Sequence, residues 1–505
     1  MKGSGHPMSI VAPSPTWLLF AGATALLGAA GCDETPAPSP ATRAASAPAS
    51  SSAAAEPPLR PTIPVLKAKP LTPEGEKLEG LFPIEGALLV AAGTRVGRIE
   101  GLVNAESDPK VVWIGEIPKM NPAIGPNYVV SVHGRHPDII GVVYANQNGR
   151  APEPTYLPIA GKGGSYVVAP GGGWGSINGV AVFGQSVVLG INSMMTGSQV
   201  LAVRGPKLAR FVTKAADFGC TDKEVPQSEY LPKQPAVFPH AFGGTPAGSL
   251  ITVGSLCGER GPALEVWGVG EQQSKILPLD EHWKHVSYAA RILPGRGDQA
   301  WVFSDSWSPV LKLDEGKVTA EPLLDRPIRN VFVSPTHQLY ASDGRTIHRL
   351  GKDGWQPAAR LTGDTEFIAL AVTPGGQFWG ASPAVQRLVV TSNRVEVEQV
   401  EQDECTTWFV DLYAVSPRND KKYTYPTTRK ALASFPDVSK LGLVEFQDRG
   451  SSRRLGITVE SRKQGEAVAA HVRETMKDED PHVFCYAPKE PREIPMGDQD
   501  AGAKP

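Results

Sequence analysis

The stretch FVSPTHQLYASDGRTIHRL, residues 332–350, shares its order of residues with AVTPGGQFWGASPAVQRLV, residues 371–389. In both, Val-Ser/Thr-Pro comes first, and a glutamine stands two positions before an aromatic residue. These aromatic residues, Tyr340 and Trp379, continue a series that begins at Trp301, with a spacing of 39 residues and a glutamine two positions before each. A fixed period of about 40 residues, with a strand, a turn and a strand in each unit, predicts a repeat architecture.

Short β-rich runs separated by Gly, Pro, Asn and Asp extend this pattern from about residue 81 to about residue 400. The clearest seven runs are residues 87–93, 138–146, 186–192, 249–256, 299–305, 338–344 and 377–383. Several are followed, after a polar turn, by a second strand-like run, such as residues 310–316 and 346–352. With 53 Gly and 47 Pro in 505 residues, the composition also favours many short strands over long helices.

The V-S/T-P-x-x-Q-Φ-aromatic order of the two quoted stretches, in which Φ is apolar, resembles the blades of β-propellers of the WD40, NHL and YVTN-like kind. The resemblance implies a mainly β fold. It implies a seven-bladed β-propeller over residues 81–402, with a mean of about 45 residues in each blade. Six or eight blades stay open, as does a β-sandwich or an irregular multi-sheet domain.

The N-terminal part carries the apolar run WLLFAGATALLGAA, residues 17–30. This run is too short to span a bilayer and has the length of the central region of a signal peptide. It ends in AAGC, residues 29–32, which resembles the lipobox of bacterial lipoproteins, although Ala29 stands where Leu is usual. The resemblance implies a signal peptide over residues 1–31, cleavage before Cys32, and attachment of lipid, such as palmitate, to Cys32. Ordinary secretion is the alternative.

Residues 32–63 have almost no large apolar side chains, so they cannot offset the entropy that is lost when a chain becomes ordered. We expect them to form a disordered tether rich in Pro, Ala and Ser. A flexible chain of about 30 residues would hold the folded part on the order of 30 Å from the membrane. The expected location is therefore a bacterial cell membrane, on its periplasmic or cell-surface side.

Four cysteines remain if Cys32 carries lipid, and four cysteines allow three pairings. Export into an oxidising compartment favours disulfides over buried thiols. We predict one bridge between Cys220 and Cys257, which are close in sequence, and one between Cys405 and Cys485 inside one C-terminal unit. The other connectivities stay open.

The repeat pattern ends near residue 403, and residues 403–490 are predicted to form a small α+β domain. The expected elements are strand 406–415, helix 426–435, hairpin 441–448 with 453–460, a helix capped by Ser461 and Gln464, and strand 481–488. The expected buried faces of the two helices are Thr428, Leu432 and Phe435, and Val468, Val472 and Met476. This β-α-β-β-α-β order is similar to that of ferredoxin-like domains, in which the first and last strands are neighbours. Residues 491–505 are expected to be a disordered tail.

The charge balance of the chain is close to neutral. Its 50 basic and 52 acidic residues give a formal net charge of −2, which produces no field strong enough to favour nucleic acid. The partners that the sequence favours are the membrane, through the lipid anchor, and an envelope protein or a glycan. No nucleic acid is expected among them.

Two histidine pairs are candidate metal ligands, His133 with His136 and His282 with His285. The i, i+3 spacing brings two imidazoles to one ion on a helix or a turn, but catalytic zinc needs a third protein ligand. The sequence identifies no third ligand for either pair. Surface histidines in loops are the simpler interpretation, and no metal is predicted.

Other patterns that carry chemistry have ordinary structural interpretations. The glycine-rich residues 169–179 lack the order GxxxxGK[ST] and open no helix, so they predict a loop between strands rather than a phosphate site. Asp305, Asp343 and Asp364 recur near the repeat turns, and turn formation explains them. No GxSxG, HExxH or CxxC motif occurs, so no catalytic residue and no cofactor is predicted.

The three evenly spaced aromatic residues, Trp301, Tyr340 and Trp379, allow two interpretations. They are an exposed platform for a carbohydrate or peptide, or they pack between the sheets of a propeller. Large residues at equivalent positions of propeller blades usually pack between sheets, so a core role is favoured.

The sequence therefore predicts a membrane-anchored envelope lipoprotein that acts as a non-enzymatic binding or interaction scaffold through a β-propeller. Since propellers support many functions, the fold alone does not select one. The alternative is a metal-dependent propeller hydrolase or lyase of lactonase-like type, periplasmic or secreted. This enzymatic alternative requires that at least three side chains from a candidate set of histidines and aspartates lie within about 5 Å of one point. That set is His133, His136, His240, Asp305, Asp343 and Asp364.

Overall fold

The computed structural model describes the chain in segments. They are residues 61–71, 78–84, 87–100, 109–116, 127–136, 139–146, 155–158, 166–167, 175–183, 186–193, 197–204, 207–212, 237–256, 261–268, 274–283, 286–287, 290–362, 367–373, 375–382, 385–396, 405–415, 420–436, 441–447, 453–476, 481–488 and 490–494. Their secondary structure consists of strands β1–β33 and helices α2 and α3, so the described chain is mainly β, as predicted. Neither of these two helices is long and apolar enough to cross a membrane.

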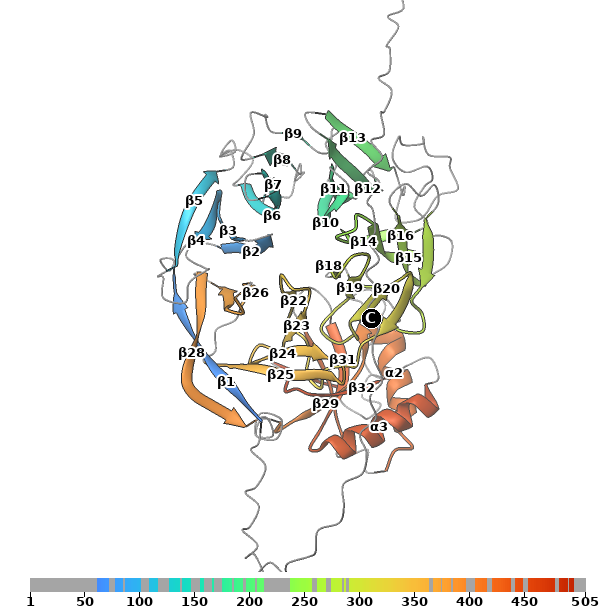
Figure 1. Ribbon diagram of the computed structural model, residues 1–505. Coiled ribbons are helices and arrows are strands. Elements are labelled where there is room, and N and C mark those ends of the chain that lie inside the picture. The colour runs from blue at the N-terminus through green and yellow to red at the C-terminus, as the bar shows by residue number, and fades with distance from the viewer. Residues whose placement is uncertain are drawn as a thin grey trace, which may run out of the picture. The chain divides into compact units, whose positions relative to one another are not determined.

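Most strands belong to antiparallel sets of four, seven of which lie within the described segments. The first three sets are β2 Leu78–Ile84, β3 Ala87–Ala92, β4 Arg95–Glu100, β5 Lys110–Glu116; β6 Asn127–His136, β7 Ile139–Asn146, β8 Thr155–Pro158, β9 Tyr166–Val167; and β10 Gly175–Phe183, β11 Ser186–Ser193, β12 Gly197–Arg204, β13 Lys207–Val212. The next three are β14 Val237–Gly244, β15 Leu250–Leu256, β16 Pro262–Trp267, β17 Lys275–Pro278; β18 Arg291–Pro294, β19 Ala300–Phe303, β20 Leu311–Asp314, β21 Lys317–Ala320; and β22 Asn330–Val333, β23 Leu339–Ser342, β24 Thr346–Gly351, β25 Gly354–Leu361. The last set is β26 Ala369–Val372, β27 Phe378–Ala381, β28 Val385–Glu396 and β1 Thr62–Pro70. Figure 1 shows these strands in chain order, from blue to orange.

The seven runs that the sequence singled out correspond to the second strand of each set, namely β3, β7, β11, β15, β19, β23 and β27. These strands pair on both sides and are rich in Val, Leu, Ile and aromatic residues, which suit a buried pleated surface. The second strand therefore carries the strongest local signal of each repeat.

The first strands of successive sets contact one another. β2 packs against β6 and β26, β14 packs against β10 and β18, and β22 packs against β18 and β26. The apolar cores lie between neighbouring sets. Leu88 and Val90 of β3, for example, share a cluster with Trp379 of β27. Antiparallel four-stranded sheets that pack face to face in this way are the blades of a propeller, so the fold is of the propeller type. The exact number of blades stays a prediction.

The last set is completed by the first described strand. β1 pairs antiparallel with β28, from Thr62 opposite Glu396 to Pro70 opposite Gln386, and it also touches β25 in parallel register. Ile63 is buried in this arrangement. The strand lies before residue 81, where the propeller was expected to begin, and overlaps the end of the expected tether, residues 32–63. Both boundaries are corrected, because the apolar residues of β1 find a sheet on which to pack.

A repeated hydrogen-bonded turn joins the first two strands of several sets. Ser334 N–H donates to Gln338 O, and Thr373 N–H donates to Gln377 O, each at 2.9 Å. In the return direction, Gln338 N–H donates to the Ser334 hydroxyl at 3.0 Å and Gln377 N–H donates to the Thr373 hydroxyl at 3.1 Å. The quoted Ser/Thr-x-x-x-Gln spacing is therefore the sequence signature of this turn.

The C-terminal part forms one five-stranded sheet with two helices. Its elements are β29 Trp408–Val415, α2 Asp420–Leu432, β30 Gly442–Gln447, β31 Arg453–Val459, α3 Arg462–Thr475, β32 His482–Cys485 and β33 Arg492–Glu493. The strand order is β32-β29-β31-β30-β33, and every pairing is antiparallel. The elements that were expected from the sequence are present in the expected order (Figure 1).

The apolar faces of both helices pack on one face of this sheet. Leu432 of α2 and Val468 and Val472 of α3 are fully buried there with Val410 of β29, and the predicted faces are confirmed. Ser461 caps α3 as predicted, because its hydroxyl accepts from Gln464 N–H at 3.2 Å. All members of this apolar cluster belong to residues 408–494, so the C-terminal unit has a core of its own.

Two details of the C-terminal unit differ from the expectation. Helix α2 begins at Asp420, so Pro426 lies inside it rather than in its first turn. The unit also continues beyond residue 490, into the expected disordered tail of residues 491–505. Ile494 is buried in the core, and its N–H donates to Leu443 O at 2.8 Å. These two contacts attach the chain around residue 494 to β30.

Candidate functional site

The three evenly spaced aromatic residues occupy the same position in consecutive sets, the second residue of β19, β23 and β27. Trp379 is fully buried and Trp301 is 9% exposed, while Tyr340 is half-buried and stacks on Phe332 at 5.4 Å between ring centroids. All three belong to apolar clusters. The core role is confirmed, and these residues form no exposed platform.

Asp343 directly follows β23 and lies at the start of the tight turn to β24. One oxygen, Oδ1, accepts from Arg345 N–H at 2.7 Å and from Thr346 N–H at 2.6 Å. Gly344, which follows Asp343 in this turn, has a φ of +97°, a conformation that residues with an L side chain rarely adopt. The aspartate therefore forms an Asx-type turn, which is the ordinary interpretation made from the sequence.

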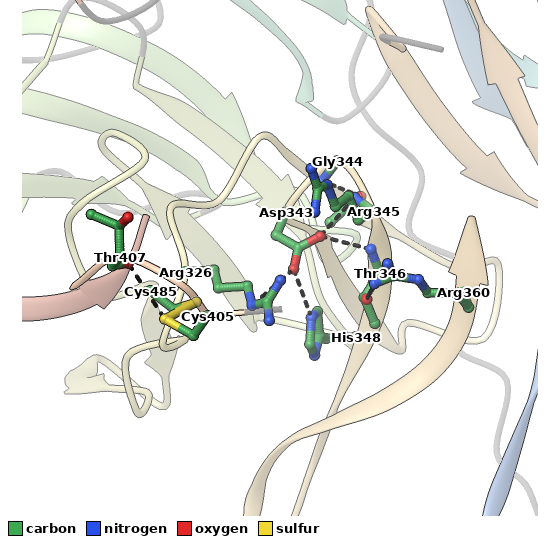
Figure 2. A network of polar contacts seen from close by, with 11 residues as sticks. Arg326, Asp343, Gly344, Arg345, Thr346, His348, Arg360, Cys405, Thr407 and Cys485 are labelled. Carbon is green, nitrogen blue, oxygen red and sulfur yellow. Dashed lines mark hydrogen bonds and ion pairs between the residues drawn. A yellow bond between two sulfur atoms is a disulfide. The ribbon is translucent and has the colours of Figure 1, made fainter. Parts of the chain in front are cut away.

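The second oxygen of Asp343 meets two basic side chains. His348 Nε2 lies 3.6 Å from Oδ2, and Arg326 Nε lies 3.7 Å from it. Figure 2 shows both side chains pointing at this carboxylate. The Asp343 side chain is only 3% exposed, and neither Oδ2 nor His348 Nε2 has a hydrogen-bond partner among the residues that the structure describes. We call Arg326, Asp343 and His348 the buried ionic cluster.

The electrostatics of this cluster favour a charged carboxylate. Burial raises the pKa of Asp343, but His348 and the backbone N–H groups of Thr346 and Arg345 lower it by more, so the pKa of the carboxyl lies below its ordinary value. Burial lowers the pKa of Arg360, whose Nη1 donates to the Thr346 hydroxyl at 3.0 Å. The arrangement holds charge in place and connects β23, β24 and β25.

A second candidate site lies where the β19–β20 loop meets the C-terminal sheet. Trp307, which is 2% exposed, is surrounded by rings at centroid distances of 5.0–5.9 Å, all in edge-on geometry. These rings are Phe409, Phe446, Phe484 and Tyr486. The Arg454 guanidinium lies 5.4 Å from the Trp307 ring centroid. We call these four rings and Arg454 the docking pocket.

The pocket is formed on the sheet face opposite the helices. Phe409 is opposite Thr458 in the β29–β31 ladder, and its ring extends over Gly456 of β31, where an added Cβ would overlap it. The absence of that side chain lets the ring lie against the sheet, beside Trp307. Edge-on aromatic contacts of this kind add to the free energy that burial of apolar area contributes.

Charged groups flank Trp307 inside this contact. Arg454 is 5% exposed and lies between two carboxylates, 3.5 Å from Asp305 Oδ1 and 3.6 Å from Asp411 Oδ2. Asp305 Oδ1 also accepts from Trp307 N–H at 2.9 Å and from the Ser308 hydroxyl at 2.9 Å. The Asp305 carboxylate thus stabilises the loop that carries Trp307 and also forms an ion pair with Arg454 of the docking pocket. Like Asp343, Asp305 is a turn former with ionic partners.

Residues 325–329, the bridging segment, join the two candidate sites. Asp325 O accepts from Cys485 N–H at 2.7 Å, and the next residue, Arg326, belongs to the buried ionic cluster through its contact with Asp343. At the other end of the segment, Arg329 N–H donates to Ser342 O at 2.7 Å, and Arg329 Nη2 donates to the Tyr486 hydroxyl at 3.3 Å. Figure 2 shows Arg326 between the Asp343 carboxylate and the cysteines of the C-terminal unit.

Cys405 and Cys485 are joined in a disulfide, as the sequence suggested, with 5.4 Å between their Cα atoms. Cys485 is opposite Trp408 in the β29–β32 ladder. Cys32, Cys220 and Cys257 lie outside the described residues. The lipid attachment and the second bridge therefore stay predictions.

The histidine and aspartate candidates are dispersed among separate elements. His133 and His136 lie on strand β6, opposite Gly141 and Ile139, rather than on a helix or a turn. His240 Nδ1 is 2.7 Å from Val286 O. His282 lies in the turn after β17, whereas His285 and Asp364 are outside the described residues, as are residues 169–174 of the glycine-rich run. Within the described segments, no three His, Cys, Asp or Glu side chains are grouped so that they could hold a metal ion.

Sequence reasoning missed the most densely connected residues. His348 and Arg326 carry no motif, and Trp307 lies outside the 39-residue series. The pair Asp305 and Trp307 offers one local signal, since an aspartate two positions before an apolar residue in a loop favours an Asx turn that fixes the direction of the ring.

No protein-family model matches the chain, and no curated protein matches it significantly. Among solved structures, a streptogramin B lyase is 12% identical with a TM-score of 0.43, covering 65% of this chain and 97% of that one. A catalytically inactive virginiamycin B lyase from Staphylococcus aureus, solved with quinupristin, is 13% identical with a TM-score of 0.42, covering 65% and 99%. Kluyveromyces lactis Hsv2 is 11% identical with a TM-score of 0.38, covering 64% and 100%. These likenesses are remote, and the activities in those names stay with those proteins.

Proposed function

We propose that this chain is a bacterial envelope lipoprotein, anchored through Cys32, whose propeller acts as a non-enzymatic binding scaffold. The observation that carries the proposal is the place where the chain enters the fold. β1 begins at Thr62, about 30 residues after Cys32, and it is the fourth strand of its set, farthest from β26. In this proposal the tether leads into this strand, and the loops at the strand ends of the propeller bind the partner.

The signal peptide over residues 1–31 and the acyl groups on Cys32, palmitate included, are parts of this proposal. They are supported by the apolar run and by the AAGC sequence that follows it. The chain would then lie on the periplasmic or cell-surface side of a bacterial membrane. Its partner there would be an envelope protein or a glycan.

The C-terminal unit is proposed to be of the ferredoxin-like type. The strand order β32-β29-β31-β30, which is fourth, first, third and second in that topology, supports this assignment. β33 would be an addition at the edge of the sheet. The unit contributes a second surface to the scaffold, carried by helices α2 and α3.

The use of the carboxylates supports a binding role over catalysis. Asp305 and Asp343, the two described aspartates of the candidate set, each accept N–H groups that close a turn and each pair with an arginine. Carboxylates engaged in this way maintain the shape of the loops.

The intact mass of the membrane-extracted protein tests the anchor, with wild type beside Cys32→Ala. The expected wild-type chain begins at Cys32 and carries added acyl mass, while the variant lacks that mass and leaves the membrane fraction. A soluble wild-type chain that is cleaved elsewhere would contradict the anchor.

The metal content of the same preparation tests the enzymatic alternative. The scaffold is expected to hold no stoichiometric divalent metal by elemental mass spectrometry. A metal at one equivalent that is lost in Asp343→Asn but retained in Asp353→Asn, at an exposed turn, would replace the scaffold proposal with the hydrolase or lyase.

A further inference from the structure

Three consecutive residues at the end of β32 and directly after it contact the propeller. Phe484 packs edge-on against Trp307 at 5.0 Å between centroids, and Tyr486 does so at 5.2 Å. Between them, Cys485 N–H donates to Asp325 O of the bridging segment at 2.7 Å. The docking of the C-terminal unit therefore depends in part on where this short strand lies, beside the contacts that Phe409, Phe446 and Arg454 make with Trp307.

The disulfide lies at the centre of that contact. β32 is an edge strand of four residues, and its register with β29 spans Asp411 opposite His482 to Trp408 opposite Cys485. The bridge from Cys485 to Cys405 fastens the end of the strand that touches the propeller. Because an edge strand of this length has few ladder hydrogen bonds, a covalent bond at its end strongly restricts its position.

The bridge is accessible, and its loss need not unfold the unit. Cys405 and Cys485 are both partly exposed, whereas the core residues Val410, Val468 and Val472 are fully buried. That core lies on the sheet face away from Trp307, and all its residues come from the C-terminal unit. The docking pocket and the core are thus separate apolar clusters, on opposite faces of one sheet.

We propose that the Cys405–Cys485 disulfide is a redox-sensitive clamp that determines whether the C-terminal unit stays docked on Trp307. In the oxidised chain, Phe484 and Tyr486 are held against the Trp307 ring. In the reduced chain, β32 separates from β29 at its Cys485 end and the pocket opens. This inference goes beyond the scaffold role and does not depend on the lipid anchor.

The reductant is a dithiol. One of its thiolates attacks a sulfur of the Cys405–Cys485 bond, which breaks as a mixed disulfide forms. The second thiol of the reductant then displaces the protein sulfur, so the protein gains two thiols while the dithiol becomes a disulfide. Two electrons and two protons pass from the dithiol to the protein, and no other oxidant or reductant is needed.

Hydrogen exchange of the full-length protein, read peptide by peptide, tests the clamp with dithiothreitol as the dithiol. The Cys220→Ser/Cys257→Ser variant is used, so that the reductant acts on the Cys405–Cys485 bond alone. On reduction, exchange of residues 304–309 and 325–329 is expected to rise about tenfold, while exchange of α3 stays unchanged, because local opening leaves the core intact. Reoxidation is expected to restore the original rates.

A matched variant with Cys405→Ser and Cys485→Ser should show the faster exchange without reductant and should not respond to dithiothreitol. Unchanged exchange at residues 304–309 after reduction would overturn the proposal. An equal rise in α3 would overturn it too, because the bond would then hold the unit together rather than control its docking.

Discussion

Trp301 and Trp307 are only six positions apart in the sequence, but they pack in two different regions of the molecule. Trp301 lies on β19 and packs between adjacent strand sets with residues such as Val331 and Leu339. Trp307 lies in the following loop and packs against rings of the C-terminal sheet. The first contact recurs with the repeat, and the second occurs at one place.

The comparison shows that two kinds of apolar contact hold this chain together. Contacts between the sets are distributed over several clusters, each supported by pairs of neighbouring sheets. The contact with the C-terminal sheet is concentrated on one indole and its charged neighbours. Substitutions in the two regions should therefore differ both in size and in which part of the chain they loosen.

The largest effect is expected for Trp379→Ala, in the repeat. Removing a fully buried indole between two sets should cost about 4 kcal/mol of the free energy of unfolding, because little around it can collapse. Urea unfolding followed by circular dichroism measures this cost. Trp355→Ala is the control, since Trp355 is only partly buried, and an equal loss in both variants would contradict the assignment.

A smaller and more local effect is expected for Trp307→Ala. The loss should be about 3 kcal/mol, because the ring leaves an aromatic pocket that the C-terminal sheet cannot fill. Hydrogen exchange should rise in residues 304–309 and 484–486 but not in β23 or β27. The control Trp307→Phe should retain part of the contact. Faster exchange throughout the repeat would remove the distinction between the two regions.

Asp343→Asn should cost about 1–2 kcal/mol near neutral pH and flatten the acid limb of the stability curve. The pKa of Asp343 is lowered in the folded chain, so its contribution is present above the pKa of the unfolded chain and is lost as pH falls through the folded value. Thermal unfolding between about pH 5 and pH 2 measures the slope. Asp353→Asn, at an exposed turn, is the control. If it changed the slope as much as Asp343→Asn, the buried ionic cluster would not be the cause of the pH dependence of stability.

The smallest effect is expected at the rim of the docking contact. Arg462 Nη1 lies 2.9 Å from Asp325 Oδ2, but both side chains are more than half exposed. Arg462→Ala should therefore cost about 0.5 kcal/mol, and the cost should shrink further in high salt. A double-mutant cycle with Asp325→Ala isolates the pair. A coupling as large as the loss in Trp307→Ala would show that docking is ionic rather than aromatic.

The repeated part of the fold could be predicted because its signals are local. Each second strand is a short apolar run bounded by turn residues, and Gln338 and Gln377 mark the same hydrogen-bonded turn. The core role of Trp379 followed from its place in the series. β1 was missed because its partner β28 is remote in sequence, so nothing nearby indicated that residues 62–70 form a strand.

The candidate sites could be predicted only in part, because they depend on contacts between elements that are distant in the chain. Asp343 was identified as a turn former, but its pairing with Arg326 needs the β21–β22 loop to fold back over β23. The Cys405–Cys485 bridge followed from the expected strand order. Trp307 gave no comparable signal, since its pocket is built from the strands β29, β30, β31 and β32, all of which begin more than 100 residues later.

The pairing of β1 with β28 also determines the order in which the chain can mature. Thr62 is synthesised long before Glu396, its partner in the ladder, so the strand that completes the last set must wait for most of the chain. Non-local closure of this kind slows folding and leaves strand edges open to association with other chains. We therefore expect a nascent chain of this protein to need protection until β28 has emerged, and we expect removal of β1 to expose the edge of β28 with which it pairs.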